Sequence, residues 1–272
     1  MNVDTAHDRG SKSWLGLEEK VCVVTGAAGG IGAQIAISLA QAGAHVALLD
    51  HDSAACDLVA ERIVQEGGKV LAIACDIADK ASVTRAALAS ERELGRPDVL
   101  VNNAAITSRG PLLDLDIEQW NRVLSVNLTG ALLCAQVFGK QMRARNGDSM
   151  IHIASIAASS PIPLGGAYSA SKTALTMLAR QLAVELADDR IRSNAVSPGL
   201  VRTPLSAHYY EDPAMLHART QMVPSRRIAE PRDIADVVLF LASERSCYVN
   251  GQELLVDGAL GRNIMALVPR PQ

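Results

Sequence analysis

Residues 21–32 read VCVVTGAAGGIG, a short apolar run that ends in a cluster of glycines. The apolar run predicts a buried strand, and a helical period begins near residue 30, so the glycines fall in the turn between strand and helix. There Gly26 would allow a tight bend, Gly30 would let the backbone approach a pyrophosphate, and Gly32 would let the helix pack closely on the strand. The helix N-terminus would offer unpaired N–H groups to phosphates. A glycine cluster alone can be a flexible turn, but this position favours a nucleotide-binding site.

Apolar strands and amphipathic helices alternate along the rest of the chain. The predicted strands are 21–26, 45–50, 70–76, 98–104, 150–155, 191–199 and 253–258, and the predicted helices lie near 30–42, 53–66, 80–93, 117–145, 167–189 and 231–243. Continuously apolar strands, each followed by a helix, indicate a parallel sheet covered on both faces. Right-handed crossovers then give a doubly wound, Rossmann-type α/β domain with seven parallel strands. We expect a polar leader at 1–16 and a single domain at 17–272.

Composition and charge exclude several classes of protein. The 272 residues carry a formal net charge of −3 and only 3% aromatic residues, which argues against nucleic acid as a ligand. No apolar run approaches the roughly 20 residues that span a bilayer. Residues 1–16 contain no apolar signal core, so we expect a cytoplasmic protein without a membrane segment. Five cysteines and six histidines show no ligand-like spacing, which predicts no metal.

Asp50 closes the second predicted strand and bears on the choice of cofactor. A carboxylate about 20 residues beyond the glycine turn accepts hydrogen bonds from the ribose of a dinucleotide and repels a 2′-phosphate. Neither His51 nor Asp52 supplies an arginine for such a phosphate, and the glycine turn contains no basic residue. We therefore predict NAD rather than NADP as the cofactor. The alternative is an aspartate that is simply solvated in a loop.

Tyr168 and Lys172 stand four residues apart in the sequence YSASK, which places them on one face of a helix. The pKa of free tyrosine is about 10, too high for a base at neutral pH. The ammonium of Lys172 would lower that pKa, so that Tyr168 could exchange a proton with a substrate hydroxyl. Ser155, at the end of a predicted strand, could hydrogen-bond the reacting oxygen. The alternative is a buried aromatic ring beside a lysine that reaches the surface.

Several motifs in a fixed order carry a resemblance to a known family. They are TGAAGGIG at 25–32, CDI at 75–77, NNAA at 102–105, VNL at 126–128, IAS at 153–155, YSASK at 168–172 and SPGLVRT at 197–203. From about residue 17 to 260 the chain resembles the classical short-chain dehydrogenases/reductases. The resemblance implies hydride transfer between a nicotinamide and the carbon of an alcohol or ketone.

The resemblance also implies roles for individual residues. The catalytic tetrad would be Asn127, Ser155, Tyr168 and Lys172. In the family the tyrosine moves the proton, the serine steadies the substrate oxygen, the lysine also binds the nicotinamide ribose, and the asparagine anchors a water. Asp76 and Ile77 would lie beside the adenine, Asn103 along the adenosine, and Val201 and Thr203 at the carboxamide. With the glycine turn, the expected cofactor contacts are Gly26, Gly30, Ile31, Gly32, Asp50, Asp76, Ile77, Asn103, Tyr168, Lys172, Val201 and Thr203.

Four functions remain in competition at this point. The first is an NAD-dependent oxidoreductase that acts on a small secondary alcohol or ketone. The second is an NADPH-dependent 3-ketoacyl carrier-protein reductase, which Asp50 disfavours. The third is a non-catalytic dinucleotide-sensing protein, for which loss of Tyr168 or Lys172 would be expected. The fourth is an extended-type sugar epimerase, which needs a larger C-terminal domain than this chain can hold.

Two further expectations concern assembly and motion. The helices near 117–145 and 167–189 carry more apolar residues than one sheet face can cover, and related proteins pair these helices, so we expect a homotetramer. The stretch at about 200–230 contains Pro204, Pro213 and Pro224 and lacks a continuous apolar face. We expect it to be irregular and to act as a substrate lid.

Overall fold

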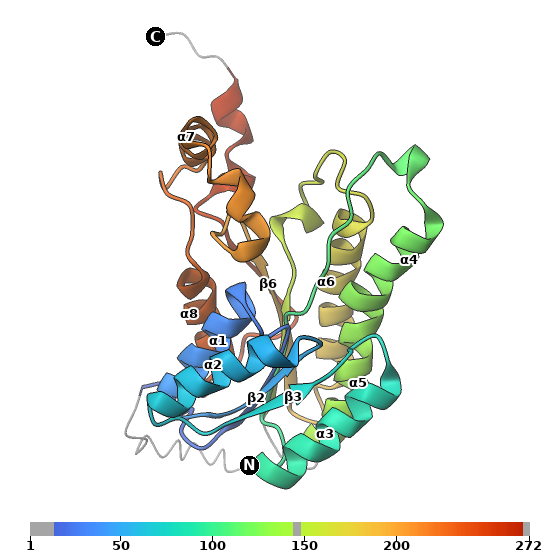
Figure 1. The fold of residues 1–272 in the computed structure, drawn as a ribbon, viewed down its shortest axis with the longest axis vertical. Coiled ribbons are helices and arrows are strands. Elements are labelled where there is room, and N and C mark those ends of the chain that lie inside the picture. The colour runs from blue at the N-terminus through green and yellow to red at the C-terminus, as the bar shows by residue number, and fades with distance from the viewer. Residues whose placement is uncertain (1–13, 144–147, 269–272) are drawn as a thin grey trace, which may run out of the picture.

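A single seven-stranded parallel sheet forms the centre of the protein (Figure 1). The computed structural model describes residues 14–143 and 148–268. The strands are β1 (Val21–Thr25), β2 (His45–Asp50), β3 (Val70–Ala74), β4 (Val99–Asn102), β5 (Asp148–Ile153), β6 (Ile191–Pro198) and β7 (Glu253–Val256). Their order is β3-β2-β1-β4-β5-β6-β7, and all neighbours are parallel. The predicted doubly wound fold is confirmed.

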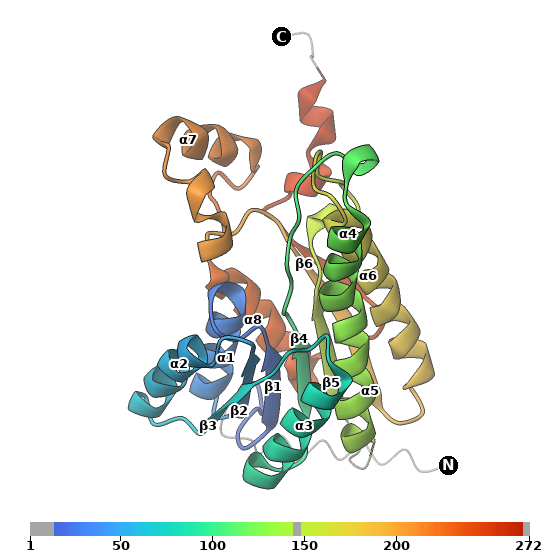
Figure 2. The same cartoon turned by 45° about the vertical axis from the view of Figure 1, so that its right-hand side comes forward.

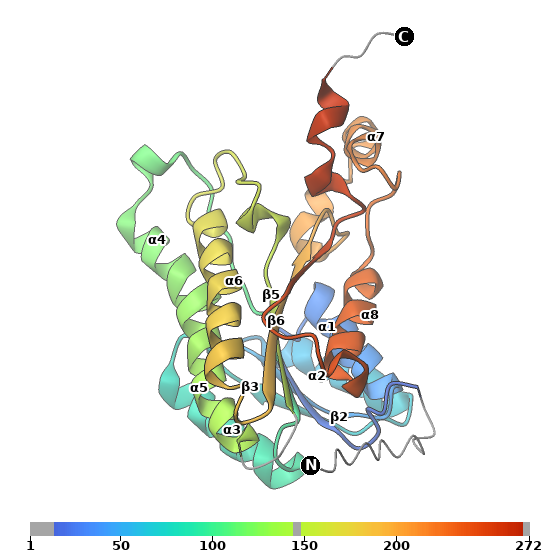
Figure 3. The ribbon, with the colours of Figure 1, turned by 180° about the vertical axis from the view of Figure 1, so that it is seen from behind.

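Helices cover both faces of the sheet (Figures 1 and 2). One face carries α1 (Gly30–Gln41), α2 (Ser53–Gln65) and α8 (Pro231–Ala242), and the other carries α3 (Lys80–Leu94), α4 (Ile117–Leu124), α5 (Ala131–Met142) and α6 (Tyr168–Glu185). The remaining α-helix, α7 (Pro213–Met222), stands apart from both layers, as the view from behind shows (Figure 3).

Strand β1, in the middle of the sheet, is almost entirely apolar because both of its faces are buried. In β1, Cys22 and Val24 belong to the core that α1 and α8 cover. Val23 points the opposite way and belongs to the second core, which includes Phe138 of α5. Successive side chains of a strand face opposite sides of the sheet, so a strand between two helical layers cannot alternate apolar with polar residues.

The strand order reverses between β1 and β4, which are neighbours in the middle of the sheet. From β1 the chain moves outward to β2 and β3, and from β4 it moves outward the other way to β7. In doubly wound folds ligands bind in the crevice outside the carboxyl ends of the strands at this reversal. The residues that follow the two strands are in close contact here, since a Cβ on Gly26 would lie 2.7 Å from the Cα of Ala104.

The helix predicted near 117–145 is interrupted. α4 ends at Leu124, Ser125–Gly130 form a π-helical turn (η2), and α5 continues from Ala131. The run Ile117–Met142 is nevertheless long and apolar enough, by length and composition, to cross a membrane, which differs from the expectation that no segment has that length. Phe138 and Met142 are fully buried in the core against the sheet, which is the pattern of a core helix.

The stretch 200–230, expected to be irregular, contains regular structure. Pro204–Tyr209 form a 3₁₀ helix (η4), and Pro213–Met222 form α7. Pro213 is the first residue of α7, where its missing N–H costs nothing and its fixed φ suits the helix. Asp212 caps the helix by accepting a hydrogen bond of 2.9 Å from the Ala214 N–H. This proline therefore begins a helix and does not break one.

Residues 1–13 of the expected leader lie outside the described residues, but its end is attached to the domain. The Nε of Arg245 donates a 2.8 Å hydrogen bond to the carbonyl oxygen of Trp14. The same guanidinium lies 5.1 Å from the centre of the Trp14 ring. Leu17 is fully buried in the core under α1. The end of the expected leader, from Trp14 on, is therefore part of the described domain.

Candidate active site

A cleft of about 1040 Å³ opens at the carboxyl ends of the strands, where the strand order reverses. Its walls come from the glycine turn, the ends of β2, β4, β5 and β6, the start of α6 and the segment that holds η4 and α7. The predicted site residues on its walls are Gly26, Gly30, Ile31, Asp50, Asn103, Ser155, Tyr168, Lys172, Val201 and Thr203. Four others, Gly32, Asp76, Ile77 and Asn127, are not on its walls. Across the described residues, no group of three or more His, Cys, Asp or Glu side chains could hold a metal ion.

The glycine turn has the geometry that a dinucleotide needs. Gly26 has a φ of +65°, which L side chains rarely adopt, and a Cβ on Gly32 would collide with the carbonyl oxygen of Gly26. Gly29 is the N-cap of α1, and no side chain caps the helix or adds an acid to its first turn. The N–H groups at the start of α1 are therefore left for an anion such as a pyrophosphate.

Asn103 supports this turn from the neighbouring strand. Its Nδ2 donates hydrogen bonds of 3.0 Å to the carbonyl oxygens of Thr25 and Gly26. The hydroxyl of Thr25 in turn accepts hydrogen bonds from the N–H groups of Asn103 and Ala104. Asn103 was expected only as a contact of the adenosine, whereas its amide holds the ends of β1 and β4 together. Sequence reasoning missed Thr25, the first letter of the glycine motif.

Asp50 ends β2 on the cofactor side of the cleft. One carboxylate oxygen accepts a hydrogen bond of 3.1 Å from the Ala28 N–H in the glycine turn. The other accepts one of 3.1 Å from the Asp52 N–H and lies 2.8 Å from Nδ1 of His51. The carboxylate is thus fixed against the glycine turn, and the oxygen that bonds the Ala28 N–H keeps a lone pair for a ribose hydroxyl.

Tyr168 is the first residue of α6, and Ser155 lies two residues after the end of β5. Both residues line the cleft. The Ser155 hydroxyl accepts a hydrogen bond of 3.1 Å from the Ala157 N–H, which fixes its position. Burial raises the pKa of the Tyr168 phenol, and a hydrogen bond with Ser155 acts in the opposite direction. This corrects the expectation that Lys172 lowers this pKa, because removal of the phenol from water is the larger effect.

Lys172 lies one helical turn after Tyr168 and is only 2% exposed. Its Nζ donates a 2.7 Å hydrogen bond to the carbonyl oxygen of Ile153 and lies 5.7 Å from the centre of the Tyr168 ring. Burial lowers the pKa of this lysine to about 7. The lysine is therefore not a surface side chain packed along an aromatic ring, which was the alternative interpretation.

Asn127 lies in the π-helical turn η2 and is 1% exposed. Its Oδ1 accepts a hydrogen bond of 2.8 Å from the Ile106 N–H, and its Nδ2 donates to the Ile106 carbonyl and to the Ser171 hydroxyl. The side chain thus connects the loop after β4 to α6, beside Lys172. It supports the walls of the cleft and does not line it.

Asp76 and Ile77, which the resemblance places beside the adenine, are not on the cleft wall. Asp76 accepts a hydrogen bond of 2.9 Å from the Ala78 N–H and so closes the turn that follows β3. Ile77 is 6% exposed, and a Cβ on Gly130 would meet its side chain at 2.8 Å. The side chain of Ile77 therefore packs beneath the π-helical turn, because the missing side chain at Gly130 leaves room for it.

Thr203 faces the glycine turn from the opposite wall of the cleft. Its side chain would lie 3.5 Å from a Cβ on Gly30. The Ser206 hydroxyl accepts from the Thr203 N–H at 3.0 Å and donates to the Val201 carbonyl at 2.7 Å. These bonds fix the chain at the base of the expected lid, between the glycine turn and η4.

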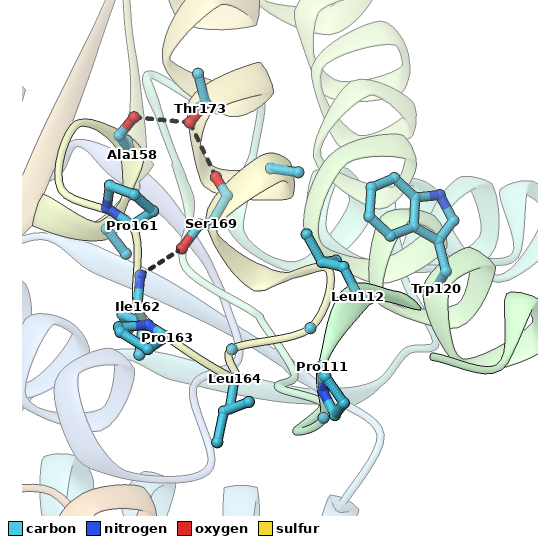
Figure 4. Close-up of a pocket in the computed structure, with 15 residues that line it drawn as sticks. Pro111, Leu112, Trp120, Ala158, Pro161, Ile162, Pro163, Leu164, Ser169 and Thr173 are labelled. Carbon is cyan, nitrogen blue, oxygen red and sulfur yellow. Dashed lines mark hydrogen bonds between the residues drawn. The ribbon is translucent and has the colours of Figure 1, made fainter. Parts of the chain in front are cut away.

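A second pocket, of about 570 Å³ and mostly apolar, lies beside the cleft (Figure 4). The segment 161–166 separates the two cavities, and Trp120 of α4 and Leu112 face the second one. This segment is attached to α6, since the Ile162 N–H donates to the Ser169 hydroxyl at 3.2 Å. The Thr173 hydroxyl donates to the Ala158 carbonyl at 2.7 Å. One side of the catalytic cleft is thus a loop held by helix α6.

Comparison with known proteins agrees with this architecture. A family model described as enoyl-(acyl carrier protein) reductase matches residues 26–260. The D-threitol dehydrogenase of Mycolicibacterium smegmatis is 37% identical over 242 residues, which cover 89% of this chain and 93% of that protein. A proposed NAD(P)-dependent gluconate 5-dehydrogenase from Beutenbergia cavernae, solved with NADP, is 38% identical with a TM-score of 0.84 over 90% of this chain and 97% of that one. A 7α-hydroxysteroid dehydrogenase in complex with NADH and 7-oxo glycochenodeoxycholic acid is 33% identical with a TM-score of 0.85, over 89% of this chain and 94% of that one.

The fold and the cleft define a Rossmann-type oxidoreductase. With these matches, the chain belongs to the classical short-chain dehydrogenase/reductase family and acts on the CH–OH group of a substrate. The solved relatives hold NADP in one case and NADH in the other, so they show a nicotinamide cofactor without a choice between the two.

Proposed function

We propose that the protein is an NAD-dependent oxidoreductase that interconverts a secondary alcohol and a ketone, with Tyr168 as proton donor and acceptor. The observation that carries this proposal is the meeting of Ser155, Tyr168 and Lys172 on one wall of a cleft whose opposite end is the glycine turn. A substrate carbon bound beside Tyr168 would then face a nicotinamide whose phosphates rest on the N-terminus of α1.

In this mechanism Tyr168 exchanges a proton with the substrate oxygen, as donor to a ketone or as acceptor from an alcohol, and a bound nicotinamide would supply or take up the hydride at the same carbon. Ser155 hydrogen-bonds the oxygen as its charge changes. Lys172 lies behind the phenol, with its Nζ held by Ile153, and offers its other protons to the ribose and to the phenolate. Because the pKa of Lys172 is lowered to about 7, this group can exchange a proton near neutral pH. Asn127 keeps α6 in register with the loop after β4.

The choice of NAD is supported by Asp50. Its carboxylate lies against the glycine turn, where it would accept hydrogen bonds from the adenosine ribose and repel a 2′-phosphate. An NADPH-dependent ketoacyl reductase would have to place that phosphate beside the Asp50 carboxylate. A non-catalytic sensor is disfavoured because the tyrosine, the lysine and the serine are all present and converge on one wall.

A screen of polyols, cyclic diols, sugars and hydroxy acids for reduction of NAD tests this function. We expect at least one class to be oxidised, and we expect Tyr168→Phe to lose nearly all turnover while its melting temperature and NADH affinity stay close to those of the wild type. Full activity in Tyr168→Phe would refute the assignment of the proton transfer to this phenol.

A further inference from the structure

Two arginines and three aromatic side chains line the substrate end of the cleft and have no part in the proton and hydride transfer. They come from the loop after β4, from η4 and the residue after it, and from α7. The group consists of Arg109, His208, Tyr209, Tyr210 and Arg219. We call it the arginine–tyrosine cluster.

The ring of Tyr209 brings the two guanidinium groups of this cluster together. The guanidinium of Arg219 lies 4.3 Å from the centre of the Tyr209 ring and that of Arg109 lies 5.3 Å from it. Arg109 also donates hydrogen bonds to the Tyr209 hydroxyl and, at 2.8 Å, to Nε2 of His208. Stacking on an aromatic ring orients a guanidinium without using all of its N–H donors.

The cluster is rich in positive charge that is not neutralised. Within the described ranges, no carboxylate lies within 4.0 Å of Arg109 or Arg219, although several other arginines do form such ion pairs. The Nε of Arg219 is buried and has no hydrogen-bond partner in the described structure. A buried, charged N–H without an acceptor destabilises the folded protein, and a bound anion would supply the missing acceptor. This geometry is therefore typical of an anion-binding site. Asp50, the acid on the cleft wall, is at the end of β2 on the cofactor side.

Arg109 is also held close to the reacting centre. The next residue, Gly110, donates a backbone hydrogen bond of 2.9 Å to the Leu164 carbonyl. Gly165 is the residue after Leu164, and its carbonyl oxygen accepts a hydrogen bond of 3.1 Å from the Tyr168 N–H. The backbone of Arg109 is thus joined, through one short loop, to the first residue of α6.

We propose that the substrate carries a carboxylate and that Arg109 and Arg219 bind it, so that the enzyme acts on hydroxy acids or on the matching keto acids. The fork of N–H groups on a guanidinium matches the two oxygens of a carboxylate. A neutral polyol would leave both guanidinium groups without a counter-ion beside it. This inference rests on the proposed function, because the carboxylate orients an alcohol whose oxygen must reach Tyr168.

Binding to the protein–NADH complex tests the inference without any need for turnover. Calorimetry would compare cyclohexanecarboxylate with cyclohexanecarboxamide, which has a similar shape but no charge, and with inorganic phosphate as a general anion. We expect the carboxylate to bind at least tenfold more tightly than the other two. Equal affinity for the carboxamide, or for phosphate, would overturn the assignment of a carboxylate site.

Substitutions then locate the site. Arg109→Gln and Arg219→Gln should each reduce the carboxylate-to-carboxamide preference at least tenfold, and Arg219→Lys, which keeps the charge, should restore part of it. Arg226→Gln is the matched control, because Arg226 is an exposed arginine of the same segment, bonded to Gln221 and absent from the cleft wall. The inference would be refuted if both glutamine variants kept the preference for carboxylate over carboxamide. It would also be refuted if they lost affinity for NADH and kept that preference.

Turnover separates this inference from the proposed function. With secondary alcohols supplied as acids and as their amides, the ratio of the two kcat/KM values should favour the acid and should fall in Arg219→Gln. Oxidation of neutral alcohols with no advantage for acids would overturn the carboxylate site and leave the proposed function in place. If the carboxylate binds through the two arginines but no alcohol is oxidised, the carboxylate site stands and the proposed function is overturned.

Discussion

The Nζ of Lys172 donates a hydrogen bond of 2.7 Å to the carbonyl oxygen of Ile153, the last residue of β5. This bond ties α6 to the strand that also delivers Ser155 to the cleft. Because the ammonium is buried, the pKa of Lys172 falls to about 7, so its charge changes near neutral pH. The same residue therefore links catalysis, cofactor binding and stability.

Lys172→Met should lower kcat at least a hundredfold and weaken NADH binding about tenfold, which are typical effects of losing a proton-transfer group and a charged hydrogen bond.

The unfolded chain holds a proton on Lys172 up to about pH 10 and the folded chain only up to about 7, so wild-type stability should rise with pH between these values. Between pH 6 and 10, the free energy of urea unfolding should rise more for the wild type than for Lys172→Met. Lys140→Met, an exposed lysine of α5, is the control, and parallel curves would contradict the prediction.

Asp50 should decide between the two nicotinamide cofactors. We expect kcat/KM with NAD to exceed that with NADP at least tenfold, which is about 1.4 kcal/mol in the transition state. Asp50→Asn removes the charge that repels the 2′-phosphate and should narrow the ratio, whereas Asp52→Asn, two residues further on, should leave it unchanged. Equal rates of the wild type with both cofactors would remove this role of Asp50.

His152 should make the protein sensitive to acid. It is fully buried between Asn102 and Ser193, and burial, with a smaller effect of the Lys172 charge, lowers its pKa to about 4. Between that value and about 6.5 only the unfolded chain binds the proton, so stability should fall as the pH drops through this window, by up to about 3 kcal/mol. His152→Gln should unfold at a lower pH than the wild type. An acid midpoint that moves equally in His217→Gln, an exposed histidine of α7, would contradict this.

The segment 203–225 should become protected when ligands bind. None of the residues of α7 is buried, so little holds this helix to the domain in the absence of a ligand. Amide exchange with NADH and a carboxylate analogue should slow there at least tenfold, while amides of β5 should not change. Exchange that is already slow without ligand would show a permanently packed segment and no lid.

A homotetramer is expected from the apolar side chains on the outer face of the helices. On α6, Met177 is 57% exposed and Val184 is 80% exposed, although both are large apolar residues. Sedimentation should give a tetramer at micromolar concentration, and Val184→Asp should shift it to smaller species. Val64→Asp, on α2 and 60% exposed, is the control that should stay tetrameric. A wild-type monomer of 28.7 kDa would overturn the expectation.

The sequence predicted the seven strands of the sheet because a strand between two helical layers is mostly apolar and therefore stands out from the amphipathic helices around it. It predicted the glycine turn and the wall with Tyr168 because their residues are neighbours in the chain. It could not predict the π-helical turn, since Asn127 is held there by Ile106 and Ser171, 21 and 44 residues away. Arg109 and Tyr209 are 100 residues apart in the chain, so no local sequence pattern could predict their contact.

Pro213 shows a different limit of the sequence. A proline is read from the sequence as an interruption, but its effect depends on its position within a helix. With Asp212 as a cap, it begins α7, and the helix carries Arg219 to the cleft. The segment first expected to be a loop thus supplies one of the two guanidinium groups of the arginine–tyrosine cluster.

The reversal of strand order between β1 and β4 has a practical consequence for anyone who wishes to re-engineer the enzyme. The glycine turn and Asp50, which are expected to bind the cofactor, follow β1 and β2, whereas the cleft residues around Tyr168 and the arginine–tyrosine cluster come from β4 onward. The two sets lie in separate segments of the chain, one before and one after the connection between β3 and β4. Preference for a cofactor pool and preference for a substrate can therefore be selected in separate libraries and then combined by a single crossover between β3 and β4.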